Sequence, residues 1–324
     1  MASDNLEIVP FTDATRVSAV DSHVYSANLV ESYCIGSVPN GGYVASCILR
    51  TASEYLAARG QPDVISAHFE YVNRTEVGRA ILVIEDVKLG RALSSIQITL
   101  YQHDLQTSAP WITSNSRKEI IGFMTNTKLS VEKGLSLPTG WALDPPPPPV
   151  DLVKMAKGED LHWAPRPKSP SPRTNSYARA QLNIEIFSPR RGQPRRGVEE
   201  SWIRFVSGEG FTNASLGFVA DCFPYVVEAW RPKKGEPPEP YAQDELFWYP
   251  TVTMNLDVKK ELREGENDWI FVRTSAKAIQ NGRFDLDVVI LDKHGDIVAL
   301  STHMCLILSA ARNLGARSNT KGKI

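Results

Sequence analysis

Residues 42–47 read GYVASC, and residues 217–222 read GFVADC, so two distant segments differ only by a Tyr/Phe and a Ser/Asp exchange. Each segment continues with apolar residues at helical spacing, the first as far as Gly60 and the second as far as Pro232. Apolar residues that recur at this spacing mark a helix with one buried face. The sequence therefore predicts two equivalent long helices in one chain.

A second pair of matching segments follows in the same order. Residues 90–91 (Gly-Arg) precede an alternating apolar run at 96–100, and residues 282–283 (Gly-Arg) precede one at 284–290. Alternation of apolar and polar residues predicts half-buried strands. The spacing of the second pair is longer than that of the helices, and the Pro- and Glu-rich residues 232–243 accommodate the difference as a surface insertion.

Each half therefore reads as an early strand, a long helix and then several antiparallel strands. We expect the later strands at 64–73, 79–89, 92–103 and 110–119, and at 250–259, 268–280, 283–292 and 296–309, with an early strand of the second half near 180–187. A helix followed by a run of strands predicts an α+β fold, because a parallel sheet would alternate strands and helices.

The segment between the two halves is rich in proline. It includes the run at 145–149, and proline has no N–H to donate to a strand ladder. We therefore predict an N-terminal unit at 1–128, an extended linker at 129–174, a C-terminal unit at 175–312 and a flexible tail at 313–324.

The balance of charge argues against a nucleic-acid partner. Lys and Arg total 36 against 37 for Asp and Glu, whereas phosphate binding needs concentrated positive charge. One basic cluster spans Arg190 to Arg196, and two interpretations stay open for it: a solvated loop, or a landing site for the phosphates of a CoA-like substrate.

The chain carries no signal for a membrane or for secretion. It lacks an apolar stretch of about 18 residues, and its start is not a basic segment followed by an apolar run. Its four cysteines are far apart, sit among apolar residues and lack metal-ligand spacing. We expect a cytoplasmic protein with reduced core thiols and no metal.

Three segments resemble the acyl-CoA thioesterase II group of the thioesterase-like superfamily: residues 38–45 (VPNGGYVA), 68–100 and 292–301 (DKHGDIVALS). The resemblance covers most of 15–125 and 175–310. It implies a double hotdog, in which two tandem units each wrap a curved antiparallel sheet around a long helix. It also implies hydrolysis of thioesters without a metal or organic cofactor, an acyl-CoA or acyl-pantetheine substrate, and a homodimer as one assembly.

The family site, as the resemblance implies it, combines an Asp on the second helix, a Thr or Ser on the next strand and a Gln near the last strand. The Asp falls on Asp221, and the hydroxyl falls on Thr253, with Thr251 as the alternative. Our alignment places Met304 at the Gln position, with His303 beside it. The family's Gln is therefore absent here, and the imidazole of His303 can replace an amide as a hydrogen-bonding group.

The residues themselves support a catalytic role for Asp221. An unpaired carboxylate on an apolar helical face is costly, and the first repeat has Ser46 at the same place. We expect Asp221 to be a general base with a raised pKa; the alternative is a structural, hydrogen-bonded Asp. Thr253 would hold the water or the acyl oxygen, or be an ordinary strand residue. His303 and its neighbour Met304 face opposite sides of a strand, so only one of them belongs to the site.

Asn40, Gly41, Gly42 and Tyr43 form the start of the first helix and are the predicted substrate-binding residues. Free N–H groups at a helix N-terminus polarise a thioester carbonyl as an oxyanion hole does. The alternative is that the glycines only permit tight packing of the helix.

The leading hypothesis is hydrolysis of a fatty-acyl or polyketide thioester by water activated near Asp221. One alternative is a hotdog enzyme adapted to dehydration, isomerisation or cyclisation in secondary metabolism. The other is a non-catalytic acyl-binding protein, because fold alone does not decide among these.

Overall fold

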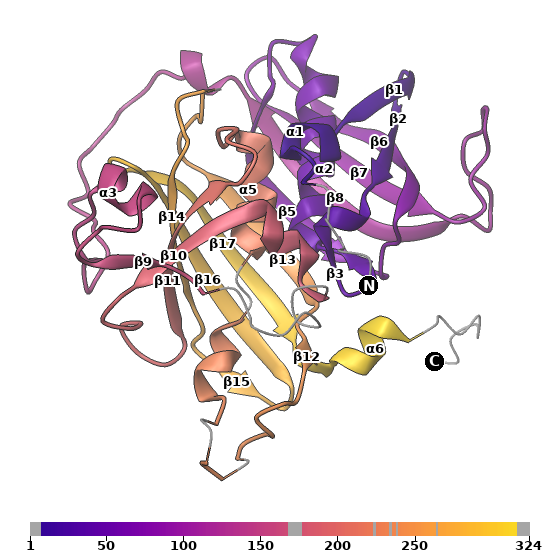
Figure 1. Cartoon of the computed structure of the whole chain (residues 1–324). Coiled ribbons are helices and arrows are strands. Elements are labelled where there is room, and N and C mark those ends of the chain that lie inside the picture. The colour runs from indigo at the N-terminus through magenta and orange to yellow at the C-terminus, as the bar shows by residue number, and fades with distance from the viewer. Residues whose placement is uncertain are drawn as a thin grey trace.

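The computed structural model describes residues 8–167, 177–222, 225–232, 235–237, 239–263 and 265–315. A single large antiparallel sheet runs through both halves of the chain (Figure 1), with the strand order β1-β2-β6-β7-β8-β5-β13-β17-β16-β14-β11-β10-β9 and β15 paired to β16. The two halves join where β5 pairs with β13, with Ala67 opposite Leu256.

The strands of the first half are β1 (Val17–Asp21), β2 (Val24–Leu29), β5 (Asp63–Tyr71), β6 (Gly78–Leu89), β7 (Ser94–Gln102) and β8 (Arg117–Thr127). Those of the second half are β9 (Trp163–Pro165), β10 (Ile184–Pro189), β11 (Val198–Phe205), β13 (Thr251–Val258), β14 (Ile270–Ser275), β15 (Ile279–Gln280), β16 (Arg283–Asp292) and β17 (Ile297–Leu306). Two small pairs complete the set: β3 (Cys34–Ile35) with β4 (Val38–Pro39), and β12 (Phe247–Trp248) with β18 (Leu308–Ser309).

The α-helices are α1 (Phe11–Ala14), α2 (Gly41–Ala57), α3 (Leu152–Ala156), α5 (Leu216–Asp221) and α6 (Ala310–Leu314). Short 3₁₀ turns lie at η1 (Glu31–Tyr33), η2 (Leu129–Val131), η3 (Arg179–Asn183), η4 (Asn213–Ser215) and η5 (Tyr225–Trp230). The predicted α+β class is confirmed: one helix from each half lies against the sheet.

Helix α2 begins where the repeat predicts. The side chain of Asn40 caps it by accepting a hydrogen bond from the Tyr43 N–H at 2.9 Å. Its apolar residues, such as Val44 and Ile48, are fully buried and pack toward the sheet. Burial of this face, more than helix propensity, holds the helix in place.

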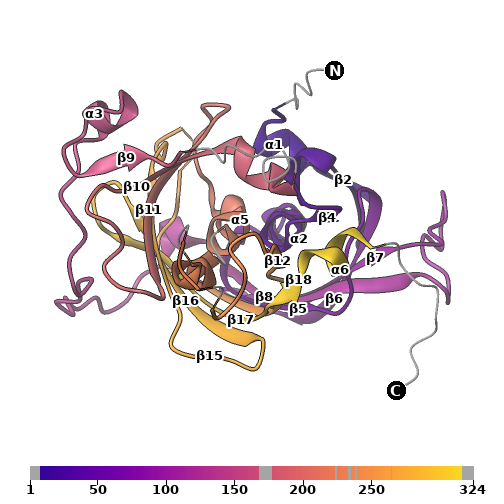
Figure 2. The same ribbon diagram turned by 60° about the horizontal axis from the view of Figure 1, so that its bottom comes forward.

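The two repeated motifs meet face to face at the centre of the molecule. Figure 2 shows α2 and α5 side by side above the sheet. A Cβ added to Gly42 would lie 2.3 Å from the Gly217 carbonyl oxygen, so only glycine allows this approach. Ser46 Oγ accepts a hydrogen bond from the Phe218 N–H at 3.0 Å, which ties the second helix to the first.

Several boundaries differ from the prediction. The second helix ends at Asp221, and the turn η5 replaces its expected continuation to Trp230. The strand expected at 110–119 is β8, whose bounds are Arg117–Thr127. The sequence analysis also missed β11, although its residues alternate in part.

The expectation that the Pro-rich linker forms no strand is wrong at β9, which pairs with the edge of the sheet through residues 187–189 of β10. The fully buried Trp163 anchors β9 against Phe271, and an edge strand tolerates Pro165 because one of its sides needs no donors. The exact domain limits stay predictions, and residues 316–324 of the predicted tail lie outside the described residues.

Candidate active site

Asp221 lies at the last residue of α5, where the two central helices meet, and only 5% of its surface is exposed. Its Oδ2 atom accepts hydrogen bonds from the Gly42 N–H at 2.8 Å and from Asn40 Nδ2 at 3.0 Å. Its Oδ1 atom accepts one from Thr251 Oγ1 at 2.7 Å. Donors from the first repeat and from β13 thus converge on one carboxylate of the second repeat.

The environment raises the pKa of Asp221 to about 6. Burial is the largest cause and raises it, while the hydrogen bonds from Thr251, Gly42 and Asn40 stabilise the charged form and lower it. Asp221 is therefore ionised at neutral pH yet close to its titration range. Those are the properties of a general base.

The hydroxyl group that contacts Asp221 belongs to Thr251 and not to Thr253. A bulge between these two residues shifts the register of β13 against β17. Beyond it, Met254 faces the core, whereas Thr253 pairs with Met304 on the outer face. The preferred prediction of Thr253 is therefore corrected to its alternative, because the bulge turns Thr251 inward.

His303 lies on the inner face of β17, beside Asp221. Its side chain is buried, and its Nδ1 atom lies 3.7 Å from Asp221 Oδ1. Met304, which the alignment places at the Gln position, lies on the opposite face, so it does not meet Asp221. Of the two neighbours weighed in the sequence, the structure brings His303 to the carboxylate.

The hydrogen bonds of His303 indicate its tautomer. Ser301 Oγ donates its proton to the Asn255 carbonyl oxygen, so it accepts from His303 Nε2, which lies 2.9 Å away. This arrangement leaves the Nδ1 lone pair facing Asp221, and Nδ1 has no hydrogen-bond partner among the described residues. Burial lowers the pKa of His303 to about 3, so the ring is neutral at physiological pH.

The residues at the start of α2 divide between two roles. Gly42 packs against α5, and its N–H donates to Asp221, so it is not free for a substrate carbonyl. Gly41 lines the pocket in front of Asp221, and its N–H has no hydrogen-bond partner in the described part of the chain. Tyr43 is fully buried and does not line the pocket, and its hydroxyl donates to the Ala14 carbonyl oxygen at 2.7 Å, so the structure does not bring this predicted substrate-binding residue to the site.

A cavity of about 470 Å³ opens in front of these residues. Asn40, Gly41, Asp221 and Thr251 line one part of it. An aromatic wall, missed in the sequence analysis, lines another: Tyr71, Tyr177, Tyr225, Phe247, Trp248 and Tyr249. The run FWYP at 247–250 was the signal, because ligand pockets are lined mainly by apolar and aromatic side chains.

The Arg190 to Arg196 loop has two parts with different roles. Arg190 is structural, since its guanidinium donates to the carbonyl oxygens of Asp160 and Gly158 at 2.9 and 3.0 Å. Arg195 and Arg196 line a second cavity of about 520 Å³. The two interpretations of the loop, solvated segment or phosphate site, therefore both stay predictions.

The four cysteines are free and buried. Within the described ranges, no cluster of three or more His, Cys, Asp and Glu side chains is placed to hold a metal ion. No described helix is long and apolar enough to cross a membrane.

Comparison with known proteins identifies the family. A family model of the acyl-CoA thioesterase N-terminal domain matches residues 29–114, and one of the C-terminal domain matches residues 142–307. The chain belongs to the acyl-CoA thioesterase family. This thioesterase-family chain is also 40% identical over 336 residues to the thioesterase-like protein TwmA of Talaromyces wortmannii, covering 96% of this chain and 95% of that protein.

Solved structures confirm the double hotdog fold of this thioesterase-family chain. A protein with a hot dog fold from Alicyclobacillus acidocaldarius superposes with a TM-score of 0.68 at 14% identity, covering 92% of this chain and 98% of that one. The acyl-CoA thioesterase II TesB2 from Mycobacterium marinum superposes with a TM-score of 0.59 at 13% identity, covering 93% and 98%. At these identities the likeness establishes the fold.

Proposed function

We propose that this protein hydrolyses an acyl-CoA or a related fatty-acyl or polyketide thioester with water activated by Asp221. The observation that carries the proposal is a buried carboxylate at the wall of a substrate-sized cavity, with three donors that orient it and a pKa of about 6. In the reaction, water oxygen bonds to the carbonyl carbon and the carbon–sulfur bond breaks. The water proton passes to Asp221 and then to the departing thiolate.

Thr251 is the proposed second partner of the attacking water. Its hydroxyl proton is committed to Asp221 Oδ1, so Oγ1 is the acceptor in its 3.6 Å contact with the Cys305 thiol, and one lone pair of Oγ1 is left to accept a hydrogen bond from water. A water held by Asp221 and by Thr251 has its own oxygen lone pair free for attack. Positioning of this kind, together with removal of the proton, is the usual contribution of a general base.

Gly41 is the proposed donor to the thioester carbonyl. Of the first N–H groups of α2, that of Gly42 is bound to Asp221 and that of Tyr43 to Asn40. The Gly41 N–H has no such partner in the described chain and borders the cavity. A donor at a helix N-terminus stabilises the negative charge that develops on the carbonyl oxygen.

His303 is proposed as a positioning residue, because it contacts Asp221 and does not line the cavity. A neutral ring with its lone pair toward Oδ1 favours the protonated form of Asp221, which exists after the water has given up its proton. A second candidate function is a proton-transfer reaction such as dehydration or isomerisation, because a base at the cavity wall, as Asp221 is, suits those steps as well.

Product analysis distinguishes these reactions. The protein is incubated with short, medium and long acyl-CoAs and with hydroxyacyl thioesters, and the products are identified by mass spectrometry. Hydrolysis gives a free acid and a free thiol, whereas dehydration leaves an intact thioester that has lost one water. Saturable binding without any product would contradict both enzymatic proposals and leave the acyl-binding alternative.

We also propose a cytoplasmic protein of fatty-acid, polyketide or secondary metabolism that forms a homodimer. Strands β1 and β9 end the large sheet, and a strand with one neighbour is a ready surface for pairing between chains. Light scattering tests the assembly: a homodimer has twice the chain mass of 35.9 kDa.

A further inference from the structure

The cavity that holds Asp221 presents two guanidinium groups from other elements, one of which is paired with a buried carboxyl group behind it. Among the described residues that line it, Asp221 is the one acidic side chain, and the basic ones are Arg74, after β5, and Arg117, at the start of β8. A substrate that reaches from Asp221 to these arginines meets two guanidinium groups. This distribution of charge favours an anionic group on the substrate.

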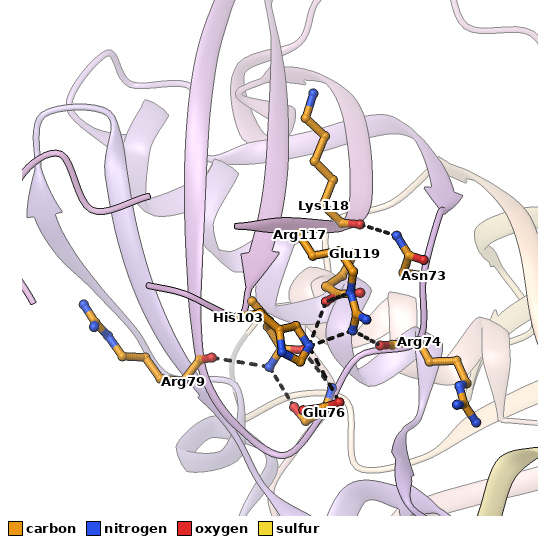
Figure 3. Close-up of polar contacts among 9 residues, drawn as sticks. Asn73, Arg74, Glu76, Arg79, His103, Arg117, Lys118 and Glu119 are labelled. Carbon is orange, nitrogen blue, oxygen red and sulfur yellow. Dashed lines mark hydrogen bonds and ion pairs between the residues drawn. The ribbon is translucent and has the colours of Figure 1, made fainter. Parts of the chain in front are cut away.

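Arg117 is held firmly by its neighbours, as Figure 3 shows. Its Nε atom donates to Glu119 Oε1 at 2.9 Å, and its Nη2 atom lies 2.7 Å from His103 Nε2 and 3.5 Å from the Arg74 carbonyl oxygen. Glu119 is fully buried, so it fixes the guanidinium from the protein side. An arginine oriented in this way loses little side-chain freedom when it binds a ligand.

The third guanidinium nitrogen of Arg117, Nη1, has N–H groups available to bind a ligand. Within the part of the chain that the structure describes, Nη1 of Arg117 makes no hydrogen bond, although the side chain lines the cavity. Arg74 differs, because its Nη1 donates to the Arg312 carbonyl oxygen at 2.5 Å and its guanidinium lies 5.9 Å from the Trp248 ring centre. Arg74 therefore secures α6 and the aromatic wall, and Arg117 is the residue poised for a ligand.

We propose that Arg117 is the anion-binding residue of the cavity and takes a phosphate or carboxylate group of the substrate, at a distance from the bond that is cleaved. Two sources of such a group exist for a thioester: the phosphate of a pantetheine carrier, or a carboxylate on the acyl chain. Guanidinium groups bind both through charged hydrogen bonds. Glu119 acts through Arg117 and is a positioning residue. The choice of a thioester as ligand rests on the proposed function, whereas the anion site itself does not.

Binding measurements without turnover test the site. Calorimetry compares phosphopantetheine with uncharged pantetheine, and a thioether analogue of an acyl-N-acetylcysteamine ending in a carboxylate with its methyl ester. Wild type is expected to prefer one or both charged probes. Arg117→Met is expected to weaken the binding of that charged probe by about 10-fold or more, which corresponds to the loss of a charged hydrogen bond. Its affinity for the uncharged counterpart should be unchanged. The probe that responds identifies the source of the anion.

Lys118→Met provides the matched control, because Lys118 follows Arg117 on the same strand and points to the other side in Figure 3. It should bind every probe as wild type does. Glu119→Leu, which removes the acceptor of the Arg117 Nε proton, should weaken binding of the charged probe alone. Arg117→Lys, which keeps the charge, should bind the charged probe more weakly than wild type, and it serves as the test variant if Arg117→Met folds poorly.

Three results would overturn the proposal: equal binding of charged probes by wild type and Arg117→Met, an equal loss in Lys118→Met, or a loss confined to an Arg195→Met, Arg196→Met double variant. The last result would place the anion at the second cavity. Because no probe is hydrolysed, failure of this proposal is separate from failure of the hydrolase proposal, which the product analysis decides.

Discussion

Replacing Thr251 by Val removes the hydrogen bond to Asp221 and the weaker 3.6 Å contact with the Cys305 thiol. The two side chains have nearly the same shape, and the bond from Oγ1 to Oδ1 measures 2.7 Å. That bond stabilises the ionised carboxylate, so its loss raises the pKa of Asp221 above its present value of about 6. Only the ionised carboxylate can accept the water proton, so the variant should be active over a narrower range of pH.

The size of the effect follows from the strength of a charged hydrogen bond. Such a bond contributes roughly 1.5–3 kcal/mol, and 1.36 kcal/mol corresponds to one pH unit, so the acid limb of the rate profile should move up by about one to two pH units. At pH 7 the ionised fraction of Asp221 then falls by a factor of about 2 to 10. Any loss beyond this factor reports the second role of Thr251, which is to hold the water.

The assay is thiol release as a function of pH between about 5 and 9, for Thr251→Val and for Thr253→Val as the matched control. Thr253 lies two residues further along β13 on its outer face, so its replacement should leave the profile unchanged. An acid limb of Thr251→Val that coincides with wild type would refute the reasoning. So would an equal shift in Thr253→Val, which would mean that any Thr replacement on this strand disturbs the site.

Three further predictions concern the surroundings of Asp221. Gly42→Ala brings a Cβ to 2.3 Å from a carbonyl oxygen of α5, so calorimetry should show a loss of about 1–3 kcal/mol in unfolding free energy, whereas Gly134→Ala, with nothing within 4 Å, should show none. His303→Gln should keep most activity because an amide still hydrogen-bonds, whereas His303→Leu should move the acid limb downward because it removes the lone pair that favours the protonated form of Asp221; equal profiles would contradict the role of His303. Tyr43→Phe should lower the melting temperature without changing KM, because the Tyr43 hydroxyl is bonded inside the core; a raised KM would return Tyr43 to the binding site.

The sequence alone predicted the features that depend on local pattern. The repeated motif placed both central helices, and a carboxylate on an apolar face singled out Asp221. The choice of Thr253 failed because a bulge in β13 reverses the expected side, and bulges leave no pattern in a single sequence. Likewise, the phase of β17, which turns His303 inward and Met304 outward, depends on its pairing with β13.

The contacts between the halves lay beyond the reach of sequence reasoning. Asn40 and Gly42 were proposed as ligands of the substrate carbonyl, yet both donate to Asp221, 179 or more residues away in the chain. Only the packing of α2 against α5 brings these groups together. Each repeat is therefore incomplete on its own: the first supplies the donors, and the second supplies the base.

The most direct test of the account is thiol release by Asp221→Asn, measured beside Asp257→Asn, which changes an exposed carboxylate on the outer face of β13. We expect kcat to fall by about 10²- to 10⁴-fold in Asp221→Asn, the contribution of a general base, and to be unchanged in Asp257→Asn. A folded Asp221→Asn protein that releases thiol at the wild-type rate would contradict the claim that this carboxylate activates the attacking water.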